Sequence, residues 1–317
     1  MFVLGCVRSG TTLLYHMLLS AGNFAIYRTE SAVLNLLEPR FGDLSVARNK
    51  RRLLNAWCES RLFTATGLDR ESIVTKVMNE CRNGGDFLRI IMSEMAAKQG
   101  VQRWADTTPE HLLYLHRIKE TIPEALVIHI IRDGRDVALS TDKQGYIRRL
   151  PWDQLPSKMA SGLYWDWMVS KGRRDGRDLG NDYVEVHFED LVREPRQTLT
   201  HLGRFIEQEL DYDQILRVGI GSVSAPNTSF GDGANFNPVG RWREGFTDEE
   251  LLVFESLVGS TLTENGYELA TKNQEMLNRT DLQLLRATYR AYFESKLYLK
   301  AKTPLGRLFV TRDLSWV

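Results

Sequence analysis

The chain has 317 residues, 43% of them hydrophobic, and its 41 basic side chains equal its 41 acidic ones, so its formal net charge is zero. This balance is typical of a globular protein and argues against a general nucleic-acid-binding protein, which would usually be basic. No apolar run approaches the roughly 18 residues of a membrane helix, and the first residues lack the pattern of a signal peptide. We therefore expect no membrane segment and no nucleic-acid partner.

The cysteine content points to a reducing compartment. Cys6, Cys58 and Cys81 lack the spacing of a metal site, and their odd number argues against a disulfide framework. These features together predict a cytoplasmic protein.

The first predicted unit is a strand, a loop and a helix. The run MFVLGCV is apolar and β-branched, and TTLLYHMLLSAG carries apolar residues at helical spacing up to Gly22. The loop between them departs from the phosphate-binding motif GxxxxGK[ST] at one position. It supplies Gly5, four residues and Gly10, but then Thr11 where the lysine belongs, followed by Thr12.

This loop predicts an anion site. Glycines let the backbone approach an anion, and the helix that follows presents free N–H groups and the positive end of its dipole. The cation is Arg8, inside the loop, in place of the missing lysine. This favours one tetrahedral centre over a metal-bound triphosphate. The alternative is a glycine turn that holds no ligand.

A second anion site is predicted after the apolar run 127–131, which suits a central parallel strand. In RDGRDVALS, Arg132 ends the strand and Ser140 follows eight residues later, about two helical turns on and hence on a similar face. Both side chains can donate to a phosphate. The alternative is that the two arginines and two aspartates of this segment pair with one another as a solvated helix start.

The remaining segments continue the alternation of strands and helices. DYVEVHFEDL predicts a third strand, and a helix should start near Pro195. The tryptophans and methionines of 85–100 and 161–176 are expected in the core. The glycine-rich segment 219–240 has no periodicity, so we expect a functional lid or disorder there.

The sequence thus predicts an α/β protein with a three-layer P-loop-type fold, in which helices flank a mostly parallel central sheet. We place the main domain at 1–270 and a C-terminal helical extension with a tail at 271–317. The amphipathic extension could pack on its own domain or on a partner subunit, in which case it would make a homo-oligomer.

The quoted motifs resemble the P-loop sulfotransferases that use 3′-phosphoadenosine 5′-phosphosulfate (PAPS). RSGTTLL resembles their 5′-phosphosulfate loop and RDGRDVALS their 3′-phosphate signature. YVEVHFEDLVREP is similar to their YEDL segment, and the stretch from VGRWREG to NGYE is similar to their late G-x-W motif and final core helix. The resemblance spans about residues 2–268. The arginine-type loop resembles the Golgi-type and bacterial branch, which includes protein-tyrosine and carbohydrate sulfotransferases.

The resemblance implies a cofactor site whose product is adenosine 3′,5′-bisphosphate (PAP). Its residues would be Arg8, Ser9, Gly10, Thr11 and Thr12 around the 5′-phosphosulfate, Arg132 and Ser140 at the 3′-phosphate, Phe188 near the adenine, and Trp242 and Arg243 in the late motif. Phe188 stands where the family commonly has a tyrosine, so plain core is the alternative there. For Trp242 the alternative is a packed side chain with two surface arginines beside it.

The resemblance also implies a general base. In the arginine-type branch a glutamate follows the loop helix, and Glu30 matches it after a one-residue shift. The alternatives for Glu30 are a helix cap before Ser31 or an ion pair with Arg28. His111 is the rival base, because imidazole titrates nearer neutrality.

One position departs from the family. Thr107 stands where a K-T-P element often has lysine, so charge neutralisation would depend mainly on Arg8, the second residue expected to act in catalysis. Asp106 and Thr108 could contact the acceptor instead.

The predicted function is transfer of a sulfuryl group to a hydroxyl or amine of a small-molecule, carbohydrate or peptide acceptor, with no metal required. The acceptor pocket should be shaped by 40–75, 144–160 and 219–240. The alternatives are a small-molecule or nucleoside kinase and a non-catalytic nucleotide-binding module.

Overall fold

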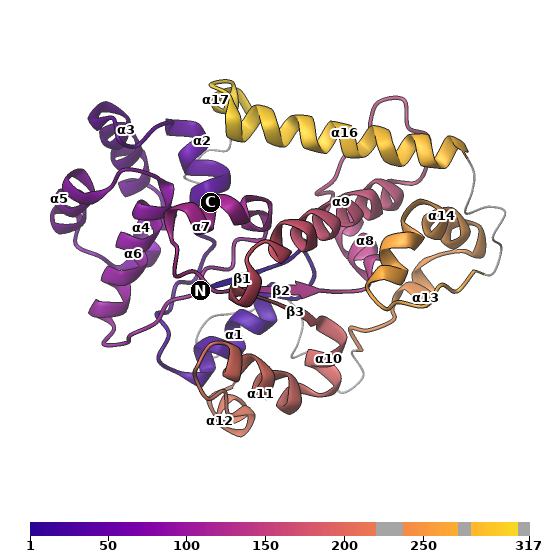
Figure 1. Ribbon diagram of the computed structural model, residues 1–317, viewed down its shortest axis with the longest axis horizontal. Coiled ribbons are helices and arrows are strands. Elements are labelled where there is room, and N and C mark those ends of the chain that lie inside the picture. Colours follow the sequence, from indigo (N-terminus) through magenta and orange to yellow (C-terminus); the bar gives the residue numbers. More distant parts are fainter. Residues whose placement is uncertain (220–236, 272–279, 310–317) are drawn as a thin grey trace.

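The computed structural model describes residues 1–219, 237–271 and 280–309 (Figure 1). Its centre is a parallel sheet of three strands in the order β1-β2-β3, namely β1 (Phe2–Leu4), β2 (Val127–Ile131) and β3 (Tyr183–His187). Phe2 pairs with Val127, which in turn pairs with Tyr183. All three strands therefore end at the same edge of the sheet. The predicted strands and their parallel arrangement are confirmed.

The sheet separates two hydrophobic cores, because alternate residues of a strand point to opposite faces. Val3, Ile128 and Ile130 join one core, and Phe2, Leu4 and Val127 join the other. The first core is closed by α1 (Thr11–Ala21), α10 (Phe188–Arg193), α11 (Pro195–Phe205) and α12 (Tyr212–Val218), which lie together below the sheet in Figure 1.

The second core is closed by helices from both sides of β2 in the sequence. Before β2 come η1 (Val33–Leu37), α2 (Glu38–Phe41), α3 (Ala47–Cys58), α4 (Arg61–Thr66), α5 (Arg70–Glu80), α6 (Gly84–Lys98), η2 (Pro109–Tyr114) and α7 (Leu115–Thr121). After β2 come α8 (Gly134–Lys143), α9 (Ser157–Arg177) and α14 (Asp248–Glu264). Two short helices, η3 (Gly180–Asp182) and α13 (Trp242–Gly245), contribute no buried residue to this core. Helices thus cover both faces of the sheet, which confirms the predicted three-layer fold.

The C-terminal extension packs on its own chain. Helix α16 (Thr280–Lys302) runs along α9 above the sheet, and α17 (Gly306–Phe309) reaches α2 (Figure 1). Tyr289 and Phe293 of α16 are buried, and the Tyr289 hydroxyl donates to Asp153 at 2.6 Å. The helical extension is confirmed, whereas its role in an oligomer and the domain boundary after residue 270 stay predictions.

Among the described residues, no helix combines the length and the apolar character that crossing a membrane requires. Most of the predicted lid, residues 220–236, lies outside the described residues, as does the tail from residue 310.

Candidate active site

The loop between β1 and α1 has a shape that its residue types explain. Gly10, the residue before α1, has a φ of +96°, and a Cβ there would lie 2.3 Å from the Phe188 ring. A Cβ on Gly5 would lie 2.4 Å from the Ile130 carbonyl oxygen. Arg8 also has a positive φ of +70°, an uncommon conformation for a non-glycine residue that is often found at ligand sites.

The first turn of α1 offers backbone N–H groups to a ligand. The N–H of Leu14 donates to the Gly10 carbonyl, which leaves the first three helical residues, Thr11 to Leu13, without an intrahelical acceptor. Among the described residues no side chain caps this end, and the first turn holds no acidic residue. The turn can therefore receive an anion, as the loop motif predicts.

Two buried polar atoms at this place lack partners. Ser9 is fully buried, and its Oγ has no hydrogen-bond partner among the described residues. The same holds for Nε of Arg132, which is 8% exposed. An unsatisfied buried polar group costs about 1–3 kcal/mol, so both atoms fit a site that a polar ligand completes.

Arg132 lies where β2 ends and contacts the loop of β1. Its Nη1 donates to the Arg8 carbonyl oxygen at 3.0 Å, and its Nη2 donates to the Pro238 carbonyl oxygen at 2.5 Å. The guanidinium also lies 4.5 Å from the centre of the buried Phe188 ring. Burial lowers the pKa of Arg132, because the charged form is poorly solvated there. An anionic ligand would compensate that loss of solvation.

Ser140 and Arg8 meet across the site. Nε of Arg8 donates to Oγ of Ser140, on α8, at 2.9 Å. The two predicted anion motifs are far apart in the sequence, but the ends of β1 and β2 bring their residues into contact. The structure therefore gathers Arg8, Ser9, Gly10, Arg132 and Phe188 around the start of α1, with Ser140 beside them.

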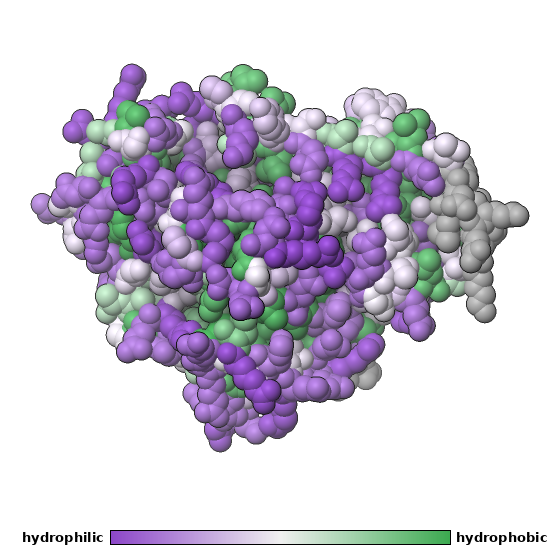
Figure 2. Space-filling model, viewed as in Figure 1, coloured by the Kyte–Doolittle hydropathy of each residue, from purple (hydrophilic) through white to green (hydrophobic). Residues whose placement is uncertain are grey.

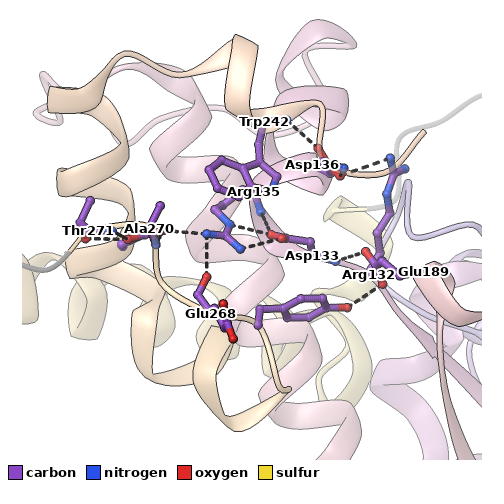
Figure 3. A network of polar contacts seen from close by, with 12 residues as sticks. Arg132, Asp133, Arg135, Asp136, Glu189, Trp242, Glu268, Ala270 and Thr271 are labelled. Atoms are coloured by element: carbon purple, nitrogen blue, oxygen red, sulfur yellow. Dashed lines mark hydrogen bonds and ion pairs between the residues drawn. The ribbon is translucent and has the colours of Figure 1, made fainter. Parts of the chain in front are cut away.

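The late motif docks on α8 through Asp136 (Figure 3). This carboxylate accepts the backbone N–H groups of Gly240 and Trp242, both at 2.8 Å. Burial raises the pKa of Asp136, although Arg132 and the two N–H groups act in the opposite direction. Trp242 is 6% exposed, with the guanidinium carbons of Arg135 and Arg243 at 3.8 and 4.6 Å from the ring centre. These are the contacts of a packed side chain, and the cofactor role of Trp242 and Arg243 stays a prediction.

Arg135 is a structural residue that the motif reading did not assign. It donates to Asp133 and to Glu255 of α14, both at 2.7 Å in their shortest contacts, and all three are buried (Figure 3). Glu255 in turn accepts the backbone N–H groups of Ala270 and Thr271. The alternative of a helix start with paired charges is correct in its pairs, since Arg135 pairs with Asp133 and Arg132 lies 3.9 Å from Asp136. It is wrong in placing these groups in solvent, because all four are buried.

Glu189 is a second residue that the motifs alone did not single out. It accepts the backbone N–H of Asp133 at 3.0 Å and the hydroxyl of Tyr267 at 2.9 Å. Burial raises the pKa of Glu189. This side chain joins the start of α8 to that of α10, and the only sequence signal for it was its place in the E-D-L segment.

Glu30 is exposed on the segment that leads into η1. The helix begins at Val33, not at Ser31, and the residue before it is Ala32, which has a φ of +50° and makes no side-chain cap of its own. The alternative of Glu30 as a helix cap is therefore wrong. Its role as the base stays a prediction.

His111, the rival base, is fully buried and uses both ring nitrogens. Nδ1 lies 2.8 Å from Oδ2 of Asp106, and Nε2 accepts the backbone N–H of Leu34 at 3.1 Å. Asp106 and Thr108 are 2% and 0% exposed, which leaves little of either side chain for an acceptor. Thr107 has a buried hydroxyl without a partner among the described residues.

A groove of about 530 Å³ follows α8. It is lined by residues of 142–157, among them Asp142, Arg148 and Gln154. This segment overlaps 144–160, one of the three predicted to shape an acceptor pocket.

Comparisons with known proteins identify the family of this chain. The profile described as the sulfotransferase family matches residues 1–212. Among solved structures, the sulfotransferase domain from the curacin biosynthetic pathway is similar at a TM-score of 0.56 and 16% identity, covering 84% of this chain and 97% of that one. The sulfotransferase domain of the Synechococcus PCC 7002 olefin synthase gives 0.48 and 19%, covering 92% and 93%. Sulfotransferase STF9 from Mycobacterium avium gives 0.46 and 16%, covering 86% and 78%. Of the three structures, the sulfotransferase domain from the curacin pathway supports the fold.

Proposed function

Because the chain belongs to the sulfotransferase family, we propose that it transfers a sulfuryl group from PAPS to a hydroxyl or amine of its acceptor. The observation that carries this proposal is the contact between the two anion motifs. Arg8 donates to Ser140, and Arg132 donates to the Arg8 carbonyl oxygen. One nucleotide with phosphate groups at both its 5′ and 3′ positions would use both motifs at once.

The residues present fit such a ligand. The uncapped first turn of α1 and the unpartnered Ser9 hydroxyl suit the 5′ group, together with the hydroxyls of Thr11 and Thr12. The desolvated guanidinium of Arg132 suits the 3′-phosphate, since its Nε has no partner among the described residues, and Ser140 would donate beside it. Phe188 already packs against Gly10 and Arg132, and an adenine would have to lie along what remains of its ring.

The chemistry of transfer requires a base and a means to neutralise charge. PAPS, when bound, supplies the sulfuryl group. Glu30 is the exposed carboxylate that would take the proton of the acceptor, a step to which a positioned base contributes roughly 10²- to 10⁴-fold. Arg8 and the N–H groups of the α1 turn would hold the negative charge of the leaving group, since Thr107 brings no charge.

Family membership also weighs against the kinase alternative. A kinase loop would use a lysine to reach the β- and γ-phosphates, and Thr11 occupies that position. The third alternative, a binding module without turnover, has no specific observation in its favour.

The acceptor would enter over the groove after α8, where aspartate, arginine and glutamine side chains offer polar contacts. The experiment for the whole proposal is a screen of phenols, sugars, amines and tyrosine peptides with PAPS labelled in its sulfate. We expect label to move to at least one class, and no movement to any class, in a protein shown to bind PAP, would support the binding module instead.

A further inference from the structure

A buried cluster beside the site has no role in the function proposed so far. It consists of Asp106, Thr108 and His111, which we call the DTH cluster. All three side chains are 0–2% exposed, and they come from the segment DTTPEH. Burying a carboxylate and an imidazole costs free energy unless both are fully hydrogen-bonded, so the partners of the cluster show what it does.

The DTH cluster lies at the edge of the sheet where the site forms. The N–H of Val3 donates to the Asp106 carbonyl oxygen at 2.9 Å, and the N–H of Asp106 donates to the Met1 carbonyl oxygen at 3.0 Å. Asp106 thus runs parallel to β1, bridged to Phe2. Residues after Asp106 therefore leave the sheet at the end of β1, where the phosphate loop begins.

Within the described residues, the side-chain hydrogen bonds that leave the DTH cluster go to residues 31–34. Thr108 accepts the backbone N–H of Ala32 at 3.2 Å, and its hydroxyl lies 3.3 Å from that of Ser31. His111 accepts the backbone N–H of Leu34 at Nε2. The segment that follows Glu30 is thus held by two side chains of the DTH cluster.

Asp106 fixes the direction of these hydrogen bonds. Since Nε2 of His111 is an acceptor, the ring proton is on Nδ1 and is donated to Oδ2 of Asp106 at 2.8 Å. Thr108 donates its hydroxyl proton to Oδ1 at 3.1 Å, which leaves its oxygen free to accept from Ala32. Burial raises the pKa of Asp106, but the hydrogen bonds that the carboxylate accepts from His111, Ser31 and the Thr108 N–H act in the opposite direction, and the pKa is lowered overall.

The held segment needs this support. Ala32 has a φ of +50°, which is strained for alanine, and it makes no side-chain cap of its own for the π-helix Val33–Leu37 that follows it. The N–H groups at such a start lack intrahelical acceptors. Thr108 and His111 supply acceptors for two of them. Such strain persists only where the surroundings fix it, and it is common at functional sites.

We propose that Asp106, Thr108 and His111 are positioning residues, which hold residues 31–34 and so fix where Glu30 presents its carboxylate. This inference rests on the proposed function, in which Glu30 takes the acceptor proton. It gives His111 a role other than that of the rival base. His111 acts through the backbone of Leu34 and keeps its proton on Nδ1.

The first test measures whether Thr108 stabilises residues 31–34, and it does not depend on activity. Thr108→Val is nearly isosteric and removes the acceptor for Ala32, and Thr108→Ser is the matched control that keeps it. By hydrogen exchange with mass spectrometry, we expect peptides that cover 31–34 to exchange roughly fivefold faster in the valine variant, as for one lost hydrogen bond. Peptides of α1 and the serine variant should be unchanged. Unchanged exchange at 31–34 in the valine variant would overturn the inference.

The second test asks whether the effect of Thr108 on turnover depends on Glu30. Turnover of labelled PAPS is measured for Thr108→Val in the native and in the Glu30→Gln background. We expect a loss of roughly 10- to 100-fold in the first, because a small displacement of a catalytic group is costly, and almost none in the second. Equal losses in both backgrounds would mean that the DTH cluster only supports the fold, and this would overturn its positioning role.

A third variant checks the imidazole. His111→Gln keeps an acceptor for the N–H of Leu34 but loses the hydrogen bond to Asp106. His111→Leu is of similar size and keeps neither contact, so the glutamine variant should retain more turnover than the leucine variant. The reverse order would contradict the assignment.

If the native protein binds PAP but turns over no PAPS, the proposed function fails together with the catalytic part of this inference. The exchange result still decides whether the DTH cluster holds residues 31–34.

Discussion

Arg132 is the residue whose surroundings best separate ligand binding from support of the fold. It donates to two carbonyl oxygens and lies over Phe188, yet its Nε has no partner among the described residues. Arg132→Ala should therefore weaken binding of PAP by roughly 1.5–3 kcal/mol, the scale of a charge-assisted hydrogen bond, and spare adenosine 5′-phosphate. Calorimetric titration of both nucleotides measures this. Equal losses for the two would mean that the arginine supports the loop instead of the 3′-phosphate.

Glu30 is the residue on which the chemistry depends most. Glu30→Gln keeps the shape and removes the base, so kcat should fall by roughly 10²- to 10⁴-fold. PAP affinity should stay within about threefold, or roughly 0.7 kcal/mol, since the side chain is not expected to touch the nucleotide. Steady-state kinetics and calorimetry on the same preparations measure the two effects. A glutamine variant that keeps most of its kcat would rule out Glu30 as the base.

Sequence reasoning at this scale worked where a motif fixes the residue type. It assigned Arg8 to one anion site and Arg132 with Ser140 to a second, and the structure brings the three residues into contact, while their roles toward a ligand stay predictions. It could not anticipate the buried partner of Arg135, because Glu255 lies on a helix far along the chain and only packing brings the two together. Nor could it show that His111 has no free nitrogen, since that depends on the Leu34 backbone.

At the scale of elements, α8 organises the site. Its first turns bind the late motif through Asp136, and Ser140 near its end contacts the phosphate loop. Helix α8 thus connects the residues around Trp242 with the loop that contains Arg8.

Asp136→Ala should lower the free energy of unfolding by about 1–3 kcal/mol, because it leaves the N–H groups of Gly240 and Trp242 without their acceptor. The matched control is Asp142→Ala, the same change at a half-exposed position of the same helix, for which we expect a change within about 0.5 kcal/mol. Urea denaturation measures both. Similar values for the two variants would contradict the docking role of Asp136.

The elements themselves were largely predictable. Strands β1, β2 and β3 and helix α1 follow from apolar runs and helical spacing, with Gly22 ending the helix. The segment after Glu30 was not predictable, because its helix starts at Val33 after a strained Ala32. Local preference does not favour that start, which is stabilised by the hydrogen bonds that the N–H groups of Ala32 and Leu34 donate to Thr108 and His111.

At the scale of the whole molecule, helix α16 of the C-terminal extension contacts the segment that lines the groove. Figure 2, from the same side as Figure 1, shows a face that is mainly hydrophilic with smaller hydrophobic areas between. The buried hydroxyl of Tyr289, on α16, accepts the N–H of Leu150 and donates to Asp153. The extension therefore shapes the region where we expect the acceptor.

Tyr289→Phe should lower the free energy of unfolding by about 1–3 kcal/mol, since it leaves two buried groups without their partner. Tyr298→Phe on the same helix is the control, because Tyr298 is 63% exposed and should tolerate the change within about 0.5 kcal/mol. Thermal and urea denaturation measure the difference. If the two variants are equally stable, α16 does not hold this segment.

The central claim is that one nucleotide, phosphorylated at 5′ and 3′, bridges the loop of Arg8 and the site of Arg132. Calorimetric titration with PAP, with ATP and Mg²⁺ as the comparison, tests it most directly. We predict that PAP binds in excess EDTA with unchanged affinity, and that ATP binds at least about tenfold more weakly, a difference of roughly 1.4 kcal/mol, because the loop lacks the lysine of a triphosphate site. Tighter binding of ATP, dependent on Mg²⁺, would contradict the account and support a kinase.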